Sequence, residues 1–292
     1  MTFDPLVQTG WLADHLDDPD IRIVDIRGYV KKRDLRGDGR QEAEYLAARD
    51  EYDEAHIPGA VYVDWTSDIT DPGDAVPAQV APPERFADLM GSLGVDDGTH
   101  VVVYDHAGSQ FATRLWWALV YYGHERVSVL DGGWKKWIAE DRPVSARIPT
   151  PEPAIFIPRP QAAWRADAGA VLAASQAPGD ALILDARDEG QYTGAVTRGE
   201  GRPGHVPGAA HLHADTLLRE GGTFLEREEI EGRLRDAGAS EDRDAPIVAY
   251  CNGGVAATVL LFNLYRLGYT NLSNYDGSWN EWGVREDLPA ER

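Results

Sequence analysis

The chain has 292 residues and a formal net charge of −21, and 43% of its residues are hydrophobic. This length and this apolar content predict two globular domains and exclude a disordered protein. The negative charge argues against nucleic acid as a partner, because phosphate binding depends on clustered Lys and Arg.

The sequence shows no sign of export or of a membrane anchor. Its apolar runs fall short of the roughly 20 residues that cross a bilayer, and the N-terminus has acids where a signal peptide has basic residues. The single cysteine excludes an intramolecular disulfide and fits a reducing compartment. We therefore expect a cytoplasmic enzyme or binding protein that does not contact the membrane.

The first predicted strand, IRIVDIR, opens an internal repeat. Three pairs of segments match: 21–27 with 181–187, 55–65 with 204–215, and 101–137 with 247–282. In the last pair Asp105 stands where the second half has the only cysteine, Cys251. The chain is therefore predicted to be a tandem duplication whose two copies differ at this position.

An insertion lengthens the first copy, chiefly over residues 28–51. It contains the basic run Lys31, Lys32 and Arg33. A solvated loop is one interpretation of such a charged run, and a segment folded over a cleft is the other. The sequence leaves this choice open.

A proline-rich stretch follows the first copy. Six prolines stand between residues 143 and 160, which favours an extended connection over a helix or a central strand. We predict a first domain over 1–145, a linker over 146–160 and a second domain over 161–292. In both domains short β-branched runs alternate with stretches of helical period, the pattern of a mainly parallel sheet covered by helices on both faces. The predicted fold class is α/β, present twice.

The lone thiol lies in the segment IVAYCNGGVAAT at 247–258. IVAY is predicted to be a buried strand with a helix beginning shortly after it, so Cys251 stands at the carboxyl end of a strand, where open α/β sheets build their sites. Gly253 and Gly254 permit positive φ and allow successive backbone N–H groups to form an anion-binding nest at the helix N-terminus. Such surroundings favour a reactive thiolate. The other interpretation, a buried cysteine that serves as a small apolar side chain, stays open at this point.

The repeated D-x-R strand ends, the two H-[IV]-P-G-A turns, the loop CNGGVA and the segment YDGSWNEW resemble the rhodanese-like sulfurtransferases in their tandem form. This family includes the thiosulfate and the 3-mercaptopyruvate sulfurtransferases. The resemblance implies a five-stranded parallel sheet flanked by helices in each domain, and a first domain without the catalytic cysteine. It also implies that Cys251 carries sulfur as a persulfide and that no metal or cofactor is needed. The loop residues implied to bind the transferred sulfur are Asn252, Gly253, Gly254, Val255 and Ala256.

The residues expected to choose the donor depart from the family pattern. Mercaptopyruvate enzymes typically carry Ser in this loop and vertebrate-like thiosulfate enzymes carry basic residues, whereas this loop has Asn252 and Gly253. The family's pair of donor-binding arginines aligns on Gln191 and Arg198. We expect Arg198 to bind the anionic end of the donor, with Arg202 as a second candidate and a solvated loop arginine as the alternative. With one guanidinium left, thiosulfate is slightly favoured over 3-mercaptopyruvate, and cyanide, a small thiol or a thioredoxin would accept the sulfur.

Four further polar residues recur in both copies. His56 and His205 begin the H-[IV]-P-G turns, where a packing role is more common than proton transfer. Asp131 and Asp276 precede Gly in the D-G-[SG]-W segments. Helix capping by these aspartates, with packing of the neighbouring tryptophans in the core, is a sufficient explanation for both segments.

Two other classes of protein share some of these features. A phosphatase or an arsenate reductase also places a cysteine in an anion nest, but its loop is C-x5-R, and the position that needs Arg holds Ala257. Without that arginine, phosphoryl transfer is disfavoured. A non-catalytic or regulatory module, or a sulfur carrier, stays open as the alternative, because the first copy has already lost its cysteine.

Overall fold

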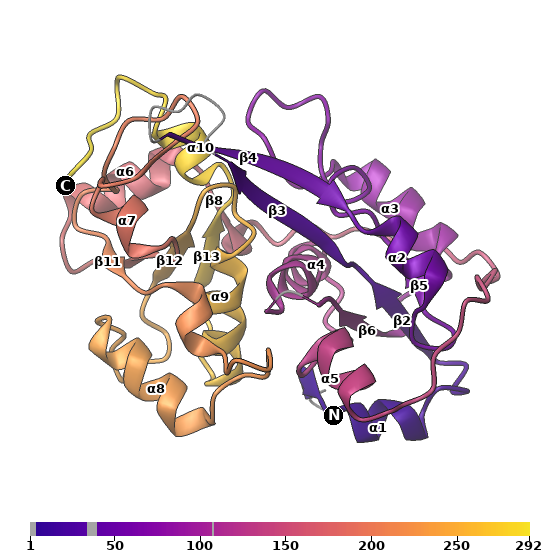
Figure 1. Ribbon diagram of the computed structural model, residues 1–292. Helices are drawn as coiled ribbons and strands as arrows, with labels where there is room; N and C mark the ends of the chain where they lie inside the picture. The colour runs from indigo at the N-terminus through magenta and orange to yellow at the C-terminus, as the bar shows by residue number, and fades with distance from the viewer. Residues whose placement is uncertain (1–3, 34–39, 107) are drawn as a thin grey trace.

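The computed structural model describes residues 4–33, 40–106 and 108–292. Two α/β halves lie side by side, the first coloured indigo to magenta and the second orange to yellow in Figure 1. Each half is built on a parallel sheet with helices on its faces. The predicted fold class and the predicted duplication are confirmed.

The two main sheets have the same strand order. The first runs β1-β7-β6-β2-β5 and the second β8-β13-β12-β9-β11, and every pair in both is parallel. The strands of the first are β1 (Leu6–Val7), β2 (Ile21–Asp25), β5 (Val61–Tyr62), β6 (His100–Tyr104) and β7 (Val127–Leu130). Those of the second are β8 (Arg165–Ala166), β9 (Leu182–Asp185), β11 (Ala210–His211), β12 (Ile247–Tyr250) and β13 (Leu272–Tyr275). The central strands β6 and β12 are buried along their whole length, as their unbroken β-branched runs predict.

Helices surround both sheets. The first half holds α1 (Thr9–Asp14), α2 (Arg49–Glu54), α3 (Pro83–Ser92), α4 (Gln110–Tyr121) and α5 (Gly133–Ala139). The second holds α6 (Ala168–Gln176), α7 (Glu189–Tyr192), α8 (Arg227–Asp236), α9 (Ala257–Arg266) and α10 (Ser278–Trp282), with 3-10 turns at η1 (Ala162–Trp164) and η2 (Ala214–Leu217). None of the helices described is both long and apolar enough to cross a membrane.

Helices α4 and α9 pack against each other where the halves meet. Thr113 and Thr258, which occupy equivalent positions in the repeat, share a hydrogen bond of 2.9 Å between their Oγ1 atoms. Trp116 stacks edge-on against Phe262, with ring centroids 5.0 Å apart. One hydrophobic cluster therefore continues from the first half into the second, and equivalent threonines of the two copies meet at this interface.

The insertion forms a hairpin rather than a solvated loop. Strand β3 (Gly28–Arg33), which holds the basic run, pairs with β4 (Arg40–Ala47) in antiparallel register. Strand β4 also pairs with β10 (Thr197–Arg198) of the second half, with Arg198 opposite Gln41. Figure 1 shows the hairpin reaching from the first half across to the second. The segment is a paired strand and not a loop, whereas the basic run Lys31, Lys32 and Arg33 is exposed to solvent, as a solvated charged run would be.

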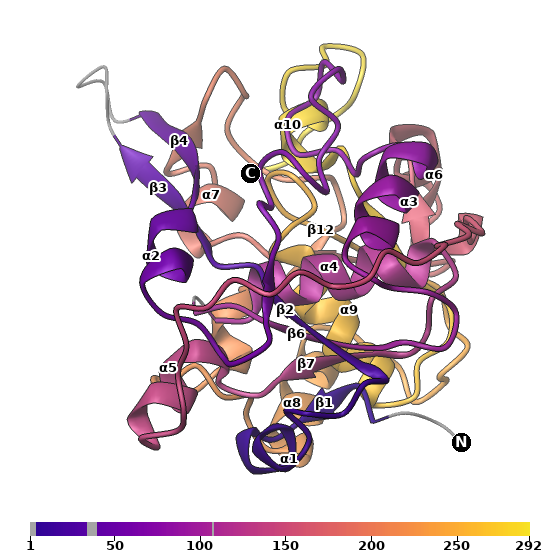
Figure 2. The same ribbon diagram turned by 90° about the vertical axis from the view of Figure 1, so that its right-hand side faces the viewer.

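The proline-rich stretch has neither helix nor strand between α5 and η1. It crosses the outer face of the first half, on the side nearest the viewer in Figure 2. It is docked there, since the N–H of Ala154 donates to the Gly91 carbonyl at 2.9 Å and Phe156 packs edge-on against Phe86 at 5.7 Å. The exact domain boundaries stay a prediction.

Candidate active site

Cys251 follows β12 directly and is 4% exposed. The loop that begins with it ends at α9, as the sequence predicts. Gly254 adopts a φ of +69°, a conformation that residues with a side chain rarely take. A Cβ at Gly254 would lie 2.9 Å from Asp276 Oδ1 and 3.0 Å from the Asp276 carbonyl oxygen. This position therefore requires glycine both for its backbone angle and for its close packing.

The backbone N–H groups of the loop divide into two sets. Those of Cys251 and Gly254 both donate to Ser278 Oγ, at 3.1 and 2.9 Å, and this hydroxyl donates to the Tyr275 carbonyl at 2.7 Å. The Gly254 N–H is therefore used inside the protein. Among the described residues, no acceptor faces the remaining loop N–H groups, which belong to Asn252, Gly253, Val255 and Ala256.

The equivalent loop in the first half is already occupied by a carboxylate. Asp105 stands in place of the thiol, and its side chain accepts hydrogen bonds from the N–H groups of Ser109, Phe111 and Ala112 at 3.1, 2.8 and 3.0 Å. In the repeat, Phe111 corresponds to Ala256. This type of loop therefore binds an anion, and in the first half the anion is its own side chain.

A cavity of about 150 Å³ opens in front of Cys251. The first half contributes Val30, Lys32, Tyr45, Trp65 and Gln110 to its wall. The second half contributes Ala186, Arg187, Asp188, Gln191, Arg198, His213, Ala214, Asp215, Cys251, Asn252, Gly253, Val255 and Ala256. Every predicted site residue except Gly254 therefore lines one cavity, and the hairpin forms its other side.

Arg198 reaches this cavity because β10 pairs with the hairpin. Its Nη2 donates to the Tyr45 hydroxyl at 3.3 Å, and its guanidinium carbon lies 5.9 Å from the centre of the Tyr45 ring. The described residues place no carboxylate within ion-pair distance of Arg198, whereas Lys32 pairs with Asp188 at 2.8 Å. Arg198 therefore presents an uncompensated positive charge to the cavity.

Gln191 is 2% exposed and joins the loop to the hairpin. Its Oε1 accepts from Asn252 Nδ2 at 2.8 Å, and its Nε2 donates to Gln41 Oε1 at 3.4 Å. Asp188 caps the N-terminus of helix α7, where its side chain accepts the Gln191 N–H at 3.0 Å. Gln191 thus holds Asn252 and does not add a second positive charge.

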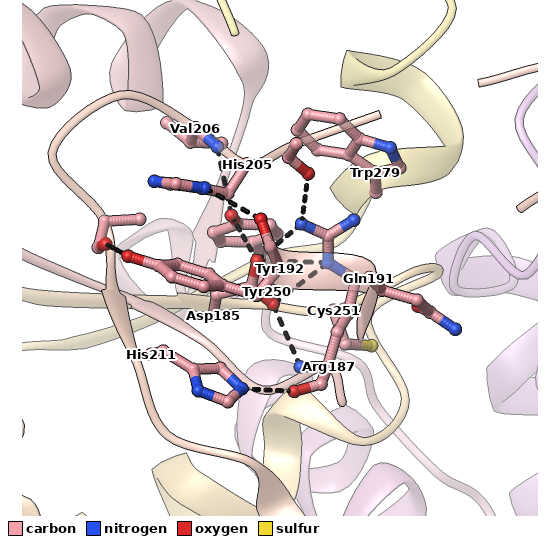
Figure 3. Close-up of polar contacts among 12 residues, drawn as sticks. Asp185, Arg187, Gln191, Tyr192, His205, Val206, His211, Tyr250, Cys251 and Trp279 are labelled. Atoms are coloured by element: carbon pink, nitrogen blue, oxygen red, sulfur yellow. Dashed lines mark hydrogen bonds and ion pairs between the residues drawn. The ribbon is translucent and has the colours of Figure 1, made fainter. Parts of the chain in front are cut away.

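The D-x-R motif lies beside Cys251, and Figure 3 shows the polar contacts of Asp185 and Arg187. Arg187 binds both oxygens of Asp185 through Nε at 3.0 Å, and its guanidinium carbon lies 4.4 Å from the Trp279 ring centre. Tyr250 donates to Asp185 Oδ2 at 2.6 Å and accepts the Val206 N–H at 3.1 Å. Burial raises the pKa of Tyr250 well above its ordinary value. These groups are fully bonded to one another, so the motif is structural.

The other sequence candidates lie outside the cavity. His205 stacks on Tyr192 at 3.9 Å with its Nδ1 2.9 Å from the Tyr192 carbonyl oxygen, and His56 makes the same arrangement with Tyr52 at 4.1 and 2.7 Å. The expected packing role of both histidines agrees with these contacts. Arg202 Nη2 donates to the carbonyl groups of Leu288 and Trp282 near the C-terminus and does not line the cavity.

The expected capping role of the two aspartates is wrong. Asp276 accepts the Val80 N–H at 3.0 Å, and Asp131 accepts the Phe224 N–H at 3.0 Å. Each carboxylate therefore binds the backbone of the opposite half. The sequence repeat marks both residues, but it cannot show partners that come from the other copy.

Comparison with known proteins agrees with this architecture. A family model described as "Rhodanese-like domain" matches residues 8–140 and 168–284. The 3-mercaptopyruvate sulfurtransferase of Escherichia coli (strain K12) is 36% identical over 295 residues, covering 98% of this chain and 97% of that protein. The thiosulfate sulfurtransferase of Cricetulus griseus is 34% identical over 292 residues, covering 95% of this chain and 91% of that protein. The crystal structure of SseA from Escherichia coli, described as a 3-mercaptopyruvate sulfotransferase, superposes with a TM-score of 0.81 at 32% identity and covers 95% of this chain and 99% of that chain.

The chain belongs to the rhodanese-like family, with one such domain in each half. It is a tandem-domain sulfurtransferase, as its relatives over nearly the full length are. No group of His, Cys, Asp or Glu suited to a metal ion occurs among the residues that the structure describes.

Proposed function

We propose that Cys251 transfers a sulfane sulfur from thiosulfate or 3-mercaptopyruvate to a thiophilic acceptor. The Cys251 thiolate attacks the outer sulfur of thiosulfate, the S–S bond breaks, and sulfite leaves with the bonding electrons. With 3-mercaptopyruvate the C–S bond breaks instead, and the leaving enolate takes a proton to become pyruvate. Both reactions leave a persulfide on Cys251, and an acceptor such as cyanide, a small thiol or a thioredoxin then removes its outer sulfur.

One observation carries the proposal: the thiol lines a cavity whose loop N–H groups have no acceptor among the residues that the structure describes, while the equivalent loop of the first half is filled by the Asp105 carboxylate. The N–H groups of Asn252, Gly253, Val255 and Ala256 would hold the persulfide anion. Preorganised backbone donors of this kind stabilise charge that develops in the transition state. Gly254 contributes the backbone turn that orients them.

Arg198 would bind the sulfonate of thiosulfate or the carboxylate of 3-mercaptopyruvate. Gln191 is engaged with Asn252 and Gln41, so a single guanidinium anchors the donor. We propose a slight preference for thiosulfate for this reason. The cytoplasm is the compartment that we assign, because a single reactive thiol needs reducing surroundings.

The test is mass spectrometry of the whole chain after incubation with each donor. We expect an increase of about 32 Da, one sulfur atom, on wild-type protein and none on Cys251→Ser, since a hydroxyl is a far weaker nucleophile at neutral pH. Parallel kinetics with both donors and cyanide then rank the donors. An unmodified wild-type chain with both donors would contradict the proposal.

A sulfur carrier or regulatory module is the second candidate, favoured by the loss of the thiol from the first half. A carrier would acquire the same sulfur atom but would release it to one specific partner rather than to cyanide or a small thiol. A persulfide without turnover on small acceptors would select this candidate.

A further inference from the structure

Arg114 is a buried charge that the mechanism above does not use. It lies on α4 in the first half and is 2% exposed. The side chain points across the interface, because three of its partners belong to other segments and two of those lie in the second half. A buried charge is costly to keep in a protein unless it is paired and bonded, so its partners indicate why it is retained.

The guanidinium of Arg114 makes one ion pair and two hydrogen bonds. Its Nη1 lies 2.7 Å from Asp276 Oδ1 and donates to the Gly254 carbonyl at 3.1 Å. Its Nη2 donates to the Ala78 carbonyl at 2.8 Å. The planar fork of arginine can reach all of these at once, which a lysine ammonium on a flexible stem does less well.

The contact with Gly254 fixes the turn of the sulfur-transfer loop from behind. The Gly254 carbonyl accepts from Arg114 and also from Asn274 Nδ2 at 2.9 Å, while its N–H is held by Ser278. Both backbone polar groups of Gly254, its N–H and its carbonyl, are therefore bonded to other parts of the protein. The N–H groups on either side of Gly254 are left to face the cavity.

The sequence repeat shows that the second half has no arginine equivalent to Arg114. Thr113 and Thr258 are equivalent, so the residue that repeats Arg114 is Val259. At the position that repeats Arg114, the second half therefore has an apolar side chain and no guanidinium. The half that holds the thiol receives a guanidinium.

We propose that Arg114 is a positioning residue for sulfur transfer, by which the thiol-free half holds the loop of the catalytic half in its anion-binding geometry. The expected effect of Arg114 on the rate rests on the proposed function. Its expected effect on the loop conformation rests on the geometry alone. Because the loop N–H groups contact the transferred sulfur and Arg198 contacts the rest of the donor, losing Arg114 should lower kcat far more than it raises KM.

The experiment compares Arg114→Met with Arg27→Met and Arg114→Lys. Arg27 is the matched control: it is a buried arginine of the same half, 1% exposed, paired with Asp25 at 2.8 Å and donating to the Ala55 carbonyl at 2.6 Å, and both of these partners lie in the first half. Per folded molecule, we expect kcat to fall roughly 10- to 100-fold in Arg114→Met with KM within about threefold, an intermediate kcat in Arg114→Lys, and kcat within about threefold of wild type in Arg27→Met.

Hydrogen–deuterium exchange of the peptide that spans residues 250–258 gives a readout that needs no activity. We expect faster exchange there in Arg114→Met than in Arg27→Met, when both are compared at the same distance below their melting temperatures. Unchanged loop exchange in Arg114→Met, or an equal loss of kcat in Arg27→Met, would overturn the inference. A wild-type chain that takes up no sulfur would contradict the proposed function, and the exchange result would still decide the role of Arg114.

Discussion

Gly254 is the residue at which a small change should have the largest effect. In Gly254→Val the new side chain would meet Asp276 at 2.9 Å and would have to adopt a φ of +69°, which a β-branched residue strongly disfavours. We expect sulfur transfer to be abolished, as measured by turnover with thiosulfate and cyanide.

Gly208→Val provides the control for this substitution. Gly208 has a φ of +76°, but nothing lies within 4 Å of an added Cβ. Gly208→Val therefore strains the backbone as Gly254→Val does, but its side chain meets no neighbouring atom and lies outside the loop of Cys251. It should lose stability yet keep its turnover per folded molecule. Full activity in Gly254→Val would show that the loop does not depend on this turn.

Arg198 should act on donor binding. Loss of a charge-assisted hydrogen bond costs about 1.5 to 3 kcal/mol, so Arg198→Ala is expected to reduce kcat/KM roughly 10- to 100-fold for both donors. Arg219→Ala, which removes an exposed arginine paired with Glu226, serves as the control and should leave kcat/KM unchanged. If Arg198→Ala keeps the wild-type value, donor binding must be assigned to the loop N–H groups.

The sequence predicts the role of a single residue when that role depends on the backbone close to it in the chain. Cys251 after a strand, and the glycine with positive φ after it, can be identified from a few residues. Arg114, Ser278 and Asp276 could not be assigned their roles, because their partners are distant in sequence: 140 residues separate Arg114 from Gly254. Such contacts follow from how the two copies meet.

The hairpin of β3 and β4 is the element that completes the cavity. Tyr45 on β4 packs edge-on against Trp65 at 5.1 Å and accepts from Arg198 at 3.3 Å. Tyr45→Phe removes only the hydroxyl, and one hydrogen bond is worth about 0.5 to 1.5 kcal/mol. We expect the donor KM to rise roughly two- to tenfold with kcat unchanged.

Tyr29→Phe is the matched change on the same hairpin. Tyr29 donates to Glu51 and lies outside the cavity, and burial raises its pKa to about 12. Removal of the Tyr29 hydroxyl should leave KM for the donor unchanged. A KM that rises equally in both variants would mean that the hairpin as a whole, and not Arg198 positioning, sets donor affinity.

Secondary elements were predictable where a pattern repeats. The inner strands β6, β9 and β12 follow from short apolar runs rich in β-branched residues, whereas edge strands such as β8 (Arg165–Ala166) and β11 (Ala210–His211) have no such run. The hairpin has no counterpart in the second copy, and its basic run resembles a solvated surface. Its pairing with β10 depends on tertiary approach, which no local periodicity encodes.

The whole molecule should lose stability as the pH falls. Burial lowers the pKa of His100 to about 4, and it also lowers the pKa of His106 and His124. Below a pH of about 6.5 these histidines bind protons in the unfolded chain but not in the folded protein. The free energy of unfolding therefore has its full value at neutral pH and decreases progressively down to about pH 4.

His100 alone should account for a loss of about 2 kcal/mol in the free energy of unfolding between pH 7 and pH 5. Urea denaturation at both pH values measures it, and His100→Gln should show a pH dependence smaller by about that amount. Equal pH dependence in the two proteins would mean that His100 titrates normally in the folded state.

The lone thiol sets the stoichiometry of the molecule. A second cysteine within reach would attack the persulfide, expel hydrogen sulfide and close a disulfide, but Cys251 has no such neighbour in this chain. In the proposed function, each polypeptide would therefore carry one sulfur atom and would return to its resting form only when an outside molecule takes that atom away. Sulfur retained in the absence of an acceptor would then count functional molecules one for one, so a sample can be titrated for its active fraction before any rate is measured.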